Sequence, residues 1–291
     1  MSSAGQAIAI TTTDGCALAA TRHAPAGRTP ARRAVLVAGA LGVPQRHYAP
    51  FCSWLAAQGH LVMSFDPRGI GASRGPQHAR SLRGLRADLL SWARDDFGAV
   101  VQHLHADSGH TIAVIGHSLG AHHALMTWPA VQAQIAQLVS VAAGAGYWRD
   151  WAAPARRRAP LLLHLAGPLL TPLFGYFPGR RVRMVADLPA GVIRQWRRWC
   201  LHPGFAWGAE PALLRPSLDA ARFTISAFSF SDDESMTEHC TRQLLAAVAH
   251  APSTLQTLQP QALGLERIGH LGAFRPYNAA LWPRLVAPLR G

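Results

Sequence analysis

Short apolar runs of strand length alternate with amphipathic segments along most of the chain. Alternation with a period of two on both sides of Asp14-Gly15 predicts a β-hairpin near the N-terminus. The expected strands after it are 34–40, 61–69, 111–116, 137–144, 222–230 and 254–258, and the expected helices are 48–58, 84–105, from 119, 238–249 and from 277. Continuous apolar strands separated by helices are typical of a parallel sheet that is covered on both faces. The pattern therefore predicts a mostly parallel, doubly wound α/β fold.

This alternation stops between residues 147 and 222. The segment holds five of the nine tryptophans and 12 arginines against four acidic residues, and it has no convincing strand pattern. It is therefore expected to be a helical, aromatic and basic cap inserted into one sheet. The predicted organisation is 1–146 for the first part of the core, 147–222 for the cap and 223–291 for the second part of the core.

The amino-acid composition is that of a folded globular protein. Hydrophobic residues make up 49% and charged residues 15% of the 291 positions, which excludes intrinsic disorder. The net charge of +13 comes from arginine alone, since lysine is absent and Asn278 is the only asparagine. A GC-rich coding bias accounts for this usage, and no stacking platform or reader motif accompanies the charge, so nucleic acid is not an expected partner.

Two features bear on location. The four cysteines are widely spaced and form no C-x-x-C pair, and the N-terminus has no signal-peptide pattern, so a cytoplasmic protein with reduced thiols is expected. Residues 159–179 are apolar enough to suggest a membrane helix, but they contain four prolines. Proline interrupts helices, so a soluble apolar insertion is the favoured interpretation of this stretch. The basic, apolar cap is also compatible with peripheral contact with a membrane.

The pentapeptide Gly116-His117-Ser118-Leu119-Gly120 fits the pattern G-x-S-x-G. It directly follows the apolar run TIAVI at 111–115 and precedes a helical run, which is the context of a nucleophile elbow. In such a turn the serine has a strained backbone and lies at a helix N-terminus, where free N–H groups stabilise a developing oxyanion. Ser118 is therefore the candidate nucleophile.

A nucleophilic serine needs a base, and the base needs an orienting acid. In this sheet topology the order along the chain is serine, acid, histidine. The strand 222–230 ends in Ser231-Asp232-Asp233-Glu234, and of the downstream histidines His270 lies in a glycine-flanked loop before the last helix. His270 is the expected base and Asp233 the favoured acid, with Asp232 as the alternative.

Backbone N–H groups complete the candidate site. Leu119 follows the nucleophile and Ala40 lies in the loop after the strand 34–40, so these two residues are the expected oxyanion donors. The pairs His122-His123 and His103/His105 lack further ligands at metal spacing and are expected on helix surfaces. No metal or cofactor is expected.

The chain resembles the α/β-hydrolase superfamily, in the branch of serine aminopeptidases and monoacylglycerol lipases, and is most similar there to bacterial hydrolases of unassigned substrate. The resemblance is carried by AGALGVPQRHYAPF, SFDPRGIGASRG, IGHSLGA, VAAGAGYW, YFPGRR, LPAGVIRQWRRWC, FSFSDDE and RIGHLGAFRP. It implies triad roles for Ser118, an aspartate of the SDD run and His270. It also implies that Asp66 and Arg68 belong to a loop that braces the site. Many relatives have His-Gly where this chain has Ala38-Gly39.

The expected function is a serine hydrolase that cleaves an ester or related acyl bond of a small apolar or lipid-like substrate. An acyltransferase that uses the same triad is one alternative. A catalytically silent protein that binds lipid or membranes is the other.

Overall fold

The protein is built around one eight-stranded sheet. The structure, a computed structural model, describes residues 5–25, 31–182 and 186–290. The strand order is β1-β2-β4-β3-β5-β6-β9-β10, in which β1–β2 and β2–β4 pair antiparallel and all other neighbours pair parallel. The strands are β1 Gln6–Thr11, β2 Ala17–His23, β3 Ala34–Ala38, β4 Leu61–Phe65, β5 Ile112–His117, β6 Ile135–Val141, β9 Thr224–Phe230 and β10 Ser253–Leu258. The expected doubly wound sheet and its N-terminal hairpin are thus confirmed.

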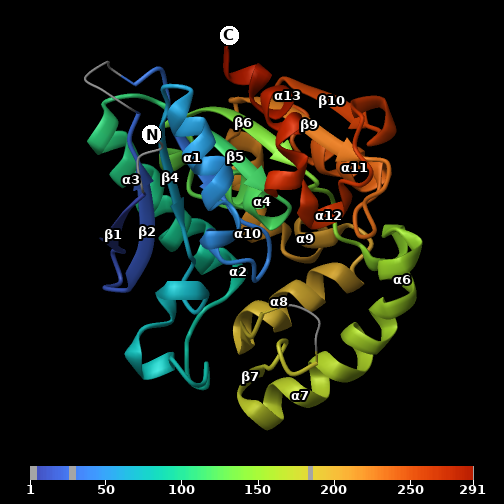
Figure 1. The fold of residues 1–291 in the computed structure, drawn as a ribbon. Helices are drawn as coiled ribbons and strands as arrows, with labels where there is room; N and C mark the ends of the chain where they lie inside the picture. Colours follow the sequence, from blue (N-terminus) through green and yellow to red (C-terminus); the bar gives the residue numbers. More distant parts are fainter. Residues whose placement is uncertain (1–4, 26–30, 183–185, 291) are drawn as a thin grey trace.

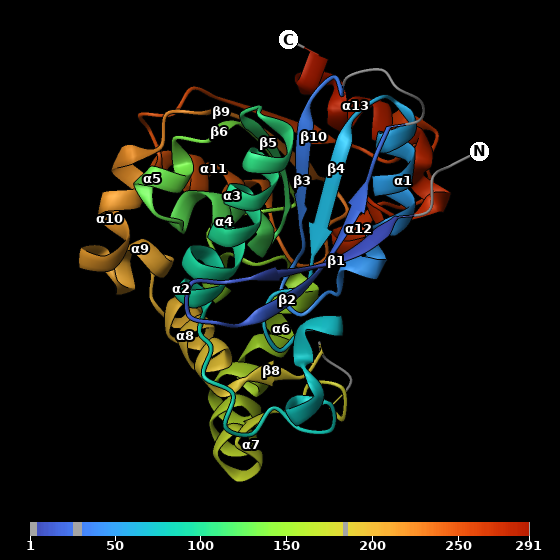
Figure 2. The same cartoon turned by 90° about the vertical axis from the view of Figure 1, so that its left-hand side faces the viewer.

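Helices cover both faces of the sheet (Figure 1 and Figure 2). Successive residues of a strand point to opposite faces, so Leu36 of β3 faces one layer while Val35 and Val37 face the other. The core helices are α1 Ala49–Ala57, α2 Leu89–Ser91, α3 Phe97–Ser108, α4 Leu119–Met126, α5 Pro129–Gln132, α10 Pro211–Ala220, α11 Glu238–Ala247, α12 Gly269–Gly272 and α13 Trp282–Val286. Helices α1 and α13 share one core with the sheet, and α3, α4, α10 and α11 share the other.

The long helix after β4 begins later than the pattern predicts. Asp88 caps it by accepting a hydrogen bond from the backbone N–H of Ser91, and the Ser91 hydroxyl accepts one from the N–H of Asp88. This capping box places the start at Leu89 instead of residue 84. The helix then runs through a π-helical segment, Trp92–Asp96, into α3.

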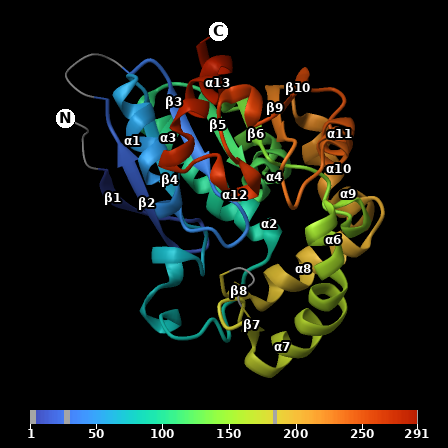
Figure 3. The same cartoon turned by 45° about the vertical axis from the view of Figure 1, so that its right-hand side comes forward.

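The chain between β6 and β9 leaves the sheet and forms an arm beyond the carboxyl ends of the parallel strands (Figure 3). Its elements are α6 Ala153–Pro160, a π-helical segment Leu161–Ala166, α7 Gly167–Phe174, β7 Tyr176–Phe177, β8 Leu188–Pro189, α8 Ala190–Leu201 and α9 Phe205–Ala209. Helix α10 follows and packs against α4 and α5 of the core. The limits of the cap at 147 and 222 stay predictions.

Prolines do not divide the arm into short helices, which differs from the expectation for 159–179. Helix α6, the π-helical segment and α7 follow one another without a break from Ala153 to Phe174. Pro168 has no N–H to give to the carbonyl of Leu163, and the guanidinium of Arg197 on α8 donates to that carbonyl instead. Among the described residues, no helix has both the length and the apolar character needed to cross a membrane.

Candidate active site

Ser118 lies at the sharp turn between β5 and α4. Its backbone is in the left-handed region, with φ 51° and ψ −117°, a strained conformation for a residue with a side chain. A Cβ atom on Gly116 would lie 2.5 Å from the backbone N of Ala121, and one on Gly120 would lie 2.1 Å from the carbonyl oxygen of Ala38. Glycine is therefore needed on both sides, and the serine is held above the carboxyl end of the sheet.

His270 and Asp233 meet Ser118 from two other parts of the chain. The Nε2 atom of His270 lies 3.1 Å from the Ser118 Oγ, and its Nδ1 lies 2.9 Å and 3.1 Å from the two carboxylate oxygens of Asp233. The Asp233 side chain is 1% exposed, and that of His270 is 13% exposed. The carboxylate can only accept, so Nδ1 carries the proton of the neutral imidazole and Nε2 is free to accept from the serine hydroxyl.

The neighbours of Asp233 hold the backbone around His270 in place. Asp232 points away from the imidazole and accepts hydrogen bonds from the N–H groups of Ile268 and Gly269 at 2.8 Å and 3.1 Å. Glu234 accepts from the N–H of His270 at 3.0 Å. Residue 270 lies in the short helix α12 and not in an irregular loop as expected. The acidic run thus divides into one carboxylate at the imidazole and two at the backbone around it.

The two backbone donors expected for the oxyanion differ in their availability. In the described part of the chain nothing accepts from the N–H of Leu119. The N–H of Ala40, in contrast, donates to the buried hydroxyl of Tyr48 at 2.8 Å. The N–H of Ala40 is therefore already used inside the core, which argues against it as an oxyanion donor. The next N–H in the loop, that of Leu41, has no acceptor among the described residues.

A buried hydrogen-bond chain links this loop to the histidine. The hydroxyl of Tyr48 lies 2.8 Å from Nδ1 of His117, and Nε2 of His117 lies 2.8 Å from the carbonyl oxygen of His270. Burial, and next the neighbouring His270, lower the pKa of His117 well below its usual value, so its imidazole is neutral. The carbonyl can only accept, so Nε2 carries the proton and Nδ1 accepts from Tyr48. Sequence reasoning missed both residues; the position of His117 inside G-x-S-x-G was the one available signal.

A pocket of about 380 Å³ opens over Ser118. The cap contributes Trp151, Ala155, Arg158 and Trp196 to its wall, and the core contributes Leu41 and Met236 among others. Trp151 and Trp196 stack with ring centroids 5.7 Å apart. A larger hollow of about 610 Å³ lies near Arg32, Trp54 and His60, before the amino ends of β3 and β4, and so away from the serine. The apolar wall suits an apolar group of a substrate.

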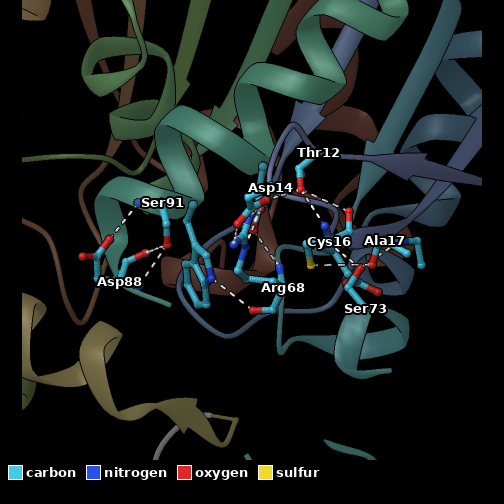
Figure 4. Close-up of polar contacts among 12 residues, drawn as sticks. Thr12, Asp14, Cys16, Ala17, Arg68, Ser73, Asp88 and Ser91 are labelled. Atoms are coloured by element: carbon cyan, nitrogen blue, oxygen red, sulfur yellow. Dashed lines mark hydrogen bonds and ion pairs between the residues drawn. The ribbon is translucent and has the colours of Figure 1, made fainter. Parts of the chain in front are cut away.

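The loop after β4 connects several segments of the core through Asp66 and Arg68. Asp66 accepts hydrogen bonds from the N–H of Gln45 at 2.7 Å, in the segment that follows the Ala40 turn, and from the N–H of Ala72 at 2.9 Å. Arg68 donates to Asp14 at the hairpin turn (Figure 4) and to the fully buried Asp96. Hydrogen bonds from Arg68 lower the pKa of Asp14 to about 2, and burial raises that of Asp96 to about 6. These contacts connect the hairpin, the loop and the π-helical segment before α3.

The histidine pair on α4 is buried, which corrects the expectation that it lies on a helix surface. His122 and His123 are 4% and 1% exposed. Burial lowers their pKa values to about 4 and about 3. His103 is exposed as expected, while His105 is half-buried. No group of three or more possible metal ligands occurs among the described residues.

Comparisons with known proteins give the family of the chain. A family model described as serine aminopeptidase, S33, matches residues 29–188, which is more than half of the chain. No curated protein matches the chain by sequence.

Solved structures of α/β hydrolases share the fold over nearly the whole length. Est1E from Butyrivibrio proteoclasticus, solved with bound ferulic acid, has a TM-score of 0.63 and 14% identity, with 97% of this chain and 98% of that chain covered. DcsB, solved with a substrate analogue, has a TM-score of 0.62 and 18% identity, with 98% and 99% covered. The Pyrococcus furiosus esterase Pf2001 has a TM-score of 0.60 and 15% identity, with 99% and 91% covered. The chain therefore has the α/β-hydrolase fold and belongs to the S33 serine aminopeptidase family of hydrolases.

Proposed function

We propose that the protein is a serine hydrolase that cleaves carboxylic esters through an acyl-enzyme. The observation that carries the proposal is the hydrogen-bonded series from the Ser118 Oγ through His270 to Asp233, at 3.1 Å and 2.9 Å. These are distances at which a base can take the proton of a nucleophile. The series lies under a pocket with an apolar wall, which supports an acyl substrate with an apolar group.

The reaction follows from these contacts. The Ser118 Oγ attacks the ester carbonyl carbon while its proton moves to Nε2 of His270, and Asp233 stabilises the resulting imidazolium. The tetrahedral intermediate collapses when the leaving alcohol takes that proton. Water then attacks the acyl-enzyme with His270 as base, which releases the acid and restores Ser118.

The negative charge of the intermediate needs two N–H donors. We assign them to Leu119 and Leu41, and no longer to Ala40. Both N–H groups lack an acceptor in the described part of the chain, and Leu41 lines the pocket. The N–H of Leu119 also lies at the positive end of the α4 dipole.

Fluorophosphonate labelling followed by intact-mass measurement tests the nucleophile. The expected result is one adduct on the wild type and none on Ser118→Ala or His270→Ala. Ser235→Ala is the matched control, because Ser235 lines the same pocket and should keep the adduct. In a p-nitrophenyl ester assay, loss of Ser118 should lower kcat by roughly 10⁴-fold or more. An adduct that persists on Ser118→Ala, or a folded wild type that takes none, would contradict the assignment.

The same assay separates hydrolysis from acyl transfer. With an alcohol added to the buffer, a hydrolase releases mainly the free acid, whereas a transferase makes the new ester, and mass spectrometry distinguishes the two products. A cytoplasmic location stays a prediction, and the four free cysteines are compatible with it.

A further inference from the structure

One side of the cap arm carries four exposed leucines at regular spacing. Leu161, Leu165, Leu169 and Leu173, here called the leucine ridge, are between 51% and 67% exposed. Residues four apart in a helix lie on the same side, so the four side chains form one row along the π-helical segment and α7. The ridge spans roughly 18 Å at 1.5 Å per residue.

The opposite side of the same helix anchors it to the cap. Its residues alternate with the ridge and are buried: Ala159, Leu163, Gly167 and Thr171. Arg83 holds the C-terminal end by donating to the carbonyls of Leu173 and Phe174, each at 3.1 Å. The ridge is therefore a fixed surface and not a frayed end. A row of apolar side chains on a solvent-exposed face marks a contact site.

Charge on the arm indicates what the ridge contacts. Residues 151–186 contain six arginines and no acidic residue. Arg156, Arg157 and Arg158 are exposed before the ridge, and Arg180 and Arg181 are exposed after it. Within the described residues, none of Arg156, Arg157 and Arg181 forms an ion pair. An apolar row with cations at both ends fits a bilayer that carries anionic headgroups.

We propose that the leucine ridge docks the protein on an anionic lipid bilayer. A second copy of this chain fits less well, because two such faces would bring like charges together at both ends of the ridge. The arm extends away from the sheet (Figure 1 and Figure 3), so a bilayer can reach the ridge without meeting the core. Ala155 and Arg158, at the start of the same helix, line the pocket over Ser118. Docking would therefore bring the pocket close to substrates dissolved in the bilayer.

Vesicle co-sedimentation of the full chain tests the proposal. The vesicles are phosphatidylcholine alone and phosphatidylcholine with about one third phosphatidylglycerol. The wild type should sediment with the anionic vesicles at least tenfold more strongly than with the neutral ones. The double variant Leu165→Ser/Leu169→Ser should lose binding at least tenfold, and Arg156→Gln/Arg157→Gln should lose the preference for anionic vesicles. Leu213→Ser is the matched control, because Leu213 is comparably exposed on α10, outside the ridge.

The readouts keep this proposal separate from the ester hydrolase proposal. Ser118→Ala should bind vesicles like the wild type, and Leu165→Ser/Leu169→Ser should keep its fluorophosphonate adduct and its thermal midpoint. A wild type that stays in the supernatant with both vesicles would overturn the docking surface. So would a leucine double variant that binds as well as the wild type. If light scattering shows a dimeric wild type and a monomeric double variant, and neither binds vesicles, the ridge is a self-association surface instead.

Discussion

The carbonyl oxygen of His270 accepts a hydrogen bond from the buried imidazole of His117 at 2.8 Å. His117 is the residue directly before Ser118. The other nitrogen of His117 accepts from Tyr48, whose hydroxyl in turn accepts from the N–H of Ala40. The loop at Ala40 and the backbone of His270 are thus held by one series of hydrogen bonds with a defined direction. A substitution of Tyr48 should therefore affect the position of both segments.

Tyr48→Phe should lower both stability and turnover. It leaves the buried N–H of Ala40 and Nδ1 of His117 without partners, and each such group costs about 1–3 kcal/mol. We expect a lower urea midpoint and a roughly tenfold lower kcat, since a small displacement of catalytic groups costs this much or more. Tyr277→Phe is the control, because Tyr277 is 69% exposed. Unchanged midpoint and kcat in Tyr48→Phe would show that the hydrogen-bond series has no role.

The two neighbouring aspartates should separate activity from stability. Asp233→Asn replaces the carboxylate that orients His270 with a neutral amide, which can hold the imidazole in the wrong tautomer, so it should lower kcat by roughly 10⁴-fold while the fold is kept. Asp232→Asn weakens the bonds from the N–H groups of Ile268 and Gly269, so it should lower the free energy of unfolding by about 1–3 kcal/mol. Kinetics and urea unfolding of both variants check this. The reverse pattern would make Asp232 the orienting acid.

His123 should make the protein less stable in acid. Its pKa is about 3 in the folded protein because it is buried, against a usual value of 6.5. The unfolded chain therefore binds a proton as the pH falls through 6.5, while the folded chain does not until about pH 3, so stability falls over this window. One such group costs about 2 kcal/mol between pH 8 and pH 5.

His123→Leu should reduce that acid sensitivity. Neither ring nitrogen of His123 has a partner among the described residues, and the ring packs against Trp92 and Phe97, so leucine keeps the site apolar. Urea unfolding at pH 8 and pH 5 should show a loss about 2 kcal/mol smaller than in the wild type. His103→Leu, on the exposed side of α3, should leave the loss unchanged. An equal loss in His123→Leu and the wild type would mean that His123 does not titrate as expected.

The stacked tryptophans should limit the length of the acyl group. Trp196→Ala removes one indole from the pocket wall, so we expect the ratio of kcat/KM for octanoate to butyrate p-nitrophenyl esters to rise roughly tenfold. Trp128→Ala is the control, because Trp128 lies under Arg94 and outside the pocket. A ratio that does not change in Trp196→Ala would place the acyl group elsewhere.

Patterns along the chain are enough to predict the parallel sheet, the turn at Ser118 and the candidate residues in the order serine, acid, histidine. These features depend on local patterns: continuous apolar runs, glycines that the turn requires, and carboxylates that follow a strand. Asp233 comes shortly after the end of a strand, and His270 lies between the last strand and the last helix. These places in the chain order are enough to name both residues as candidates.

The tertiary fold determines which carboxylate reaches the imidazole, because Asp232 and Asp233 are neighbours in one turn and a local pattern does not show which side chain faces His270. It also decided that the N–H of Ala40 is used by Tyr48, a contact between side chain and backbone that has no sequence signature. The burial of His122 and His123 depends on what covers α4, and the carbonyl of Leu163, which receives no N–H from Pro168, accepts from Arg197 of another helix. Each of these outcomes comes from groups distant in sequence, which a pattern along the chain does not record.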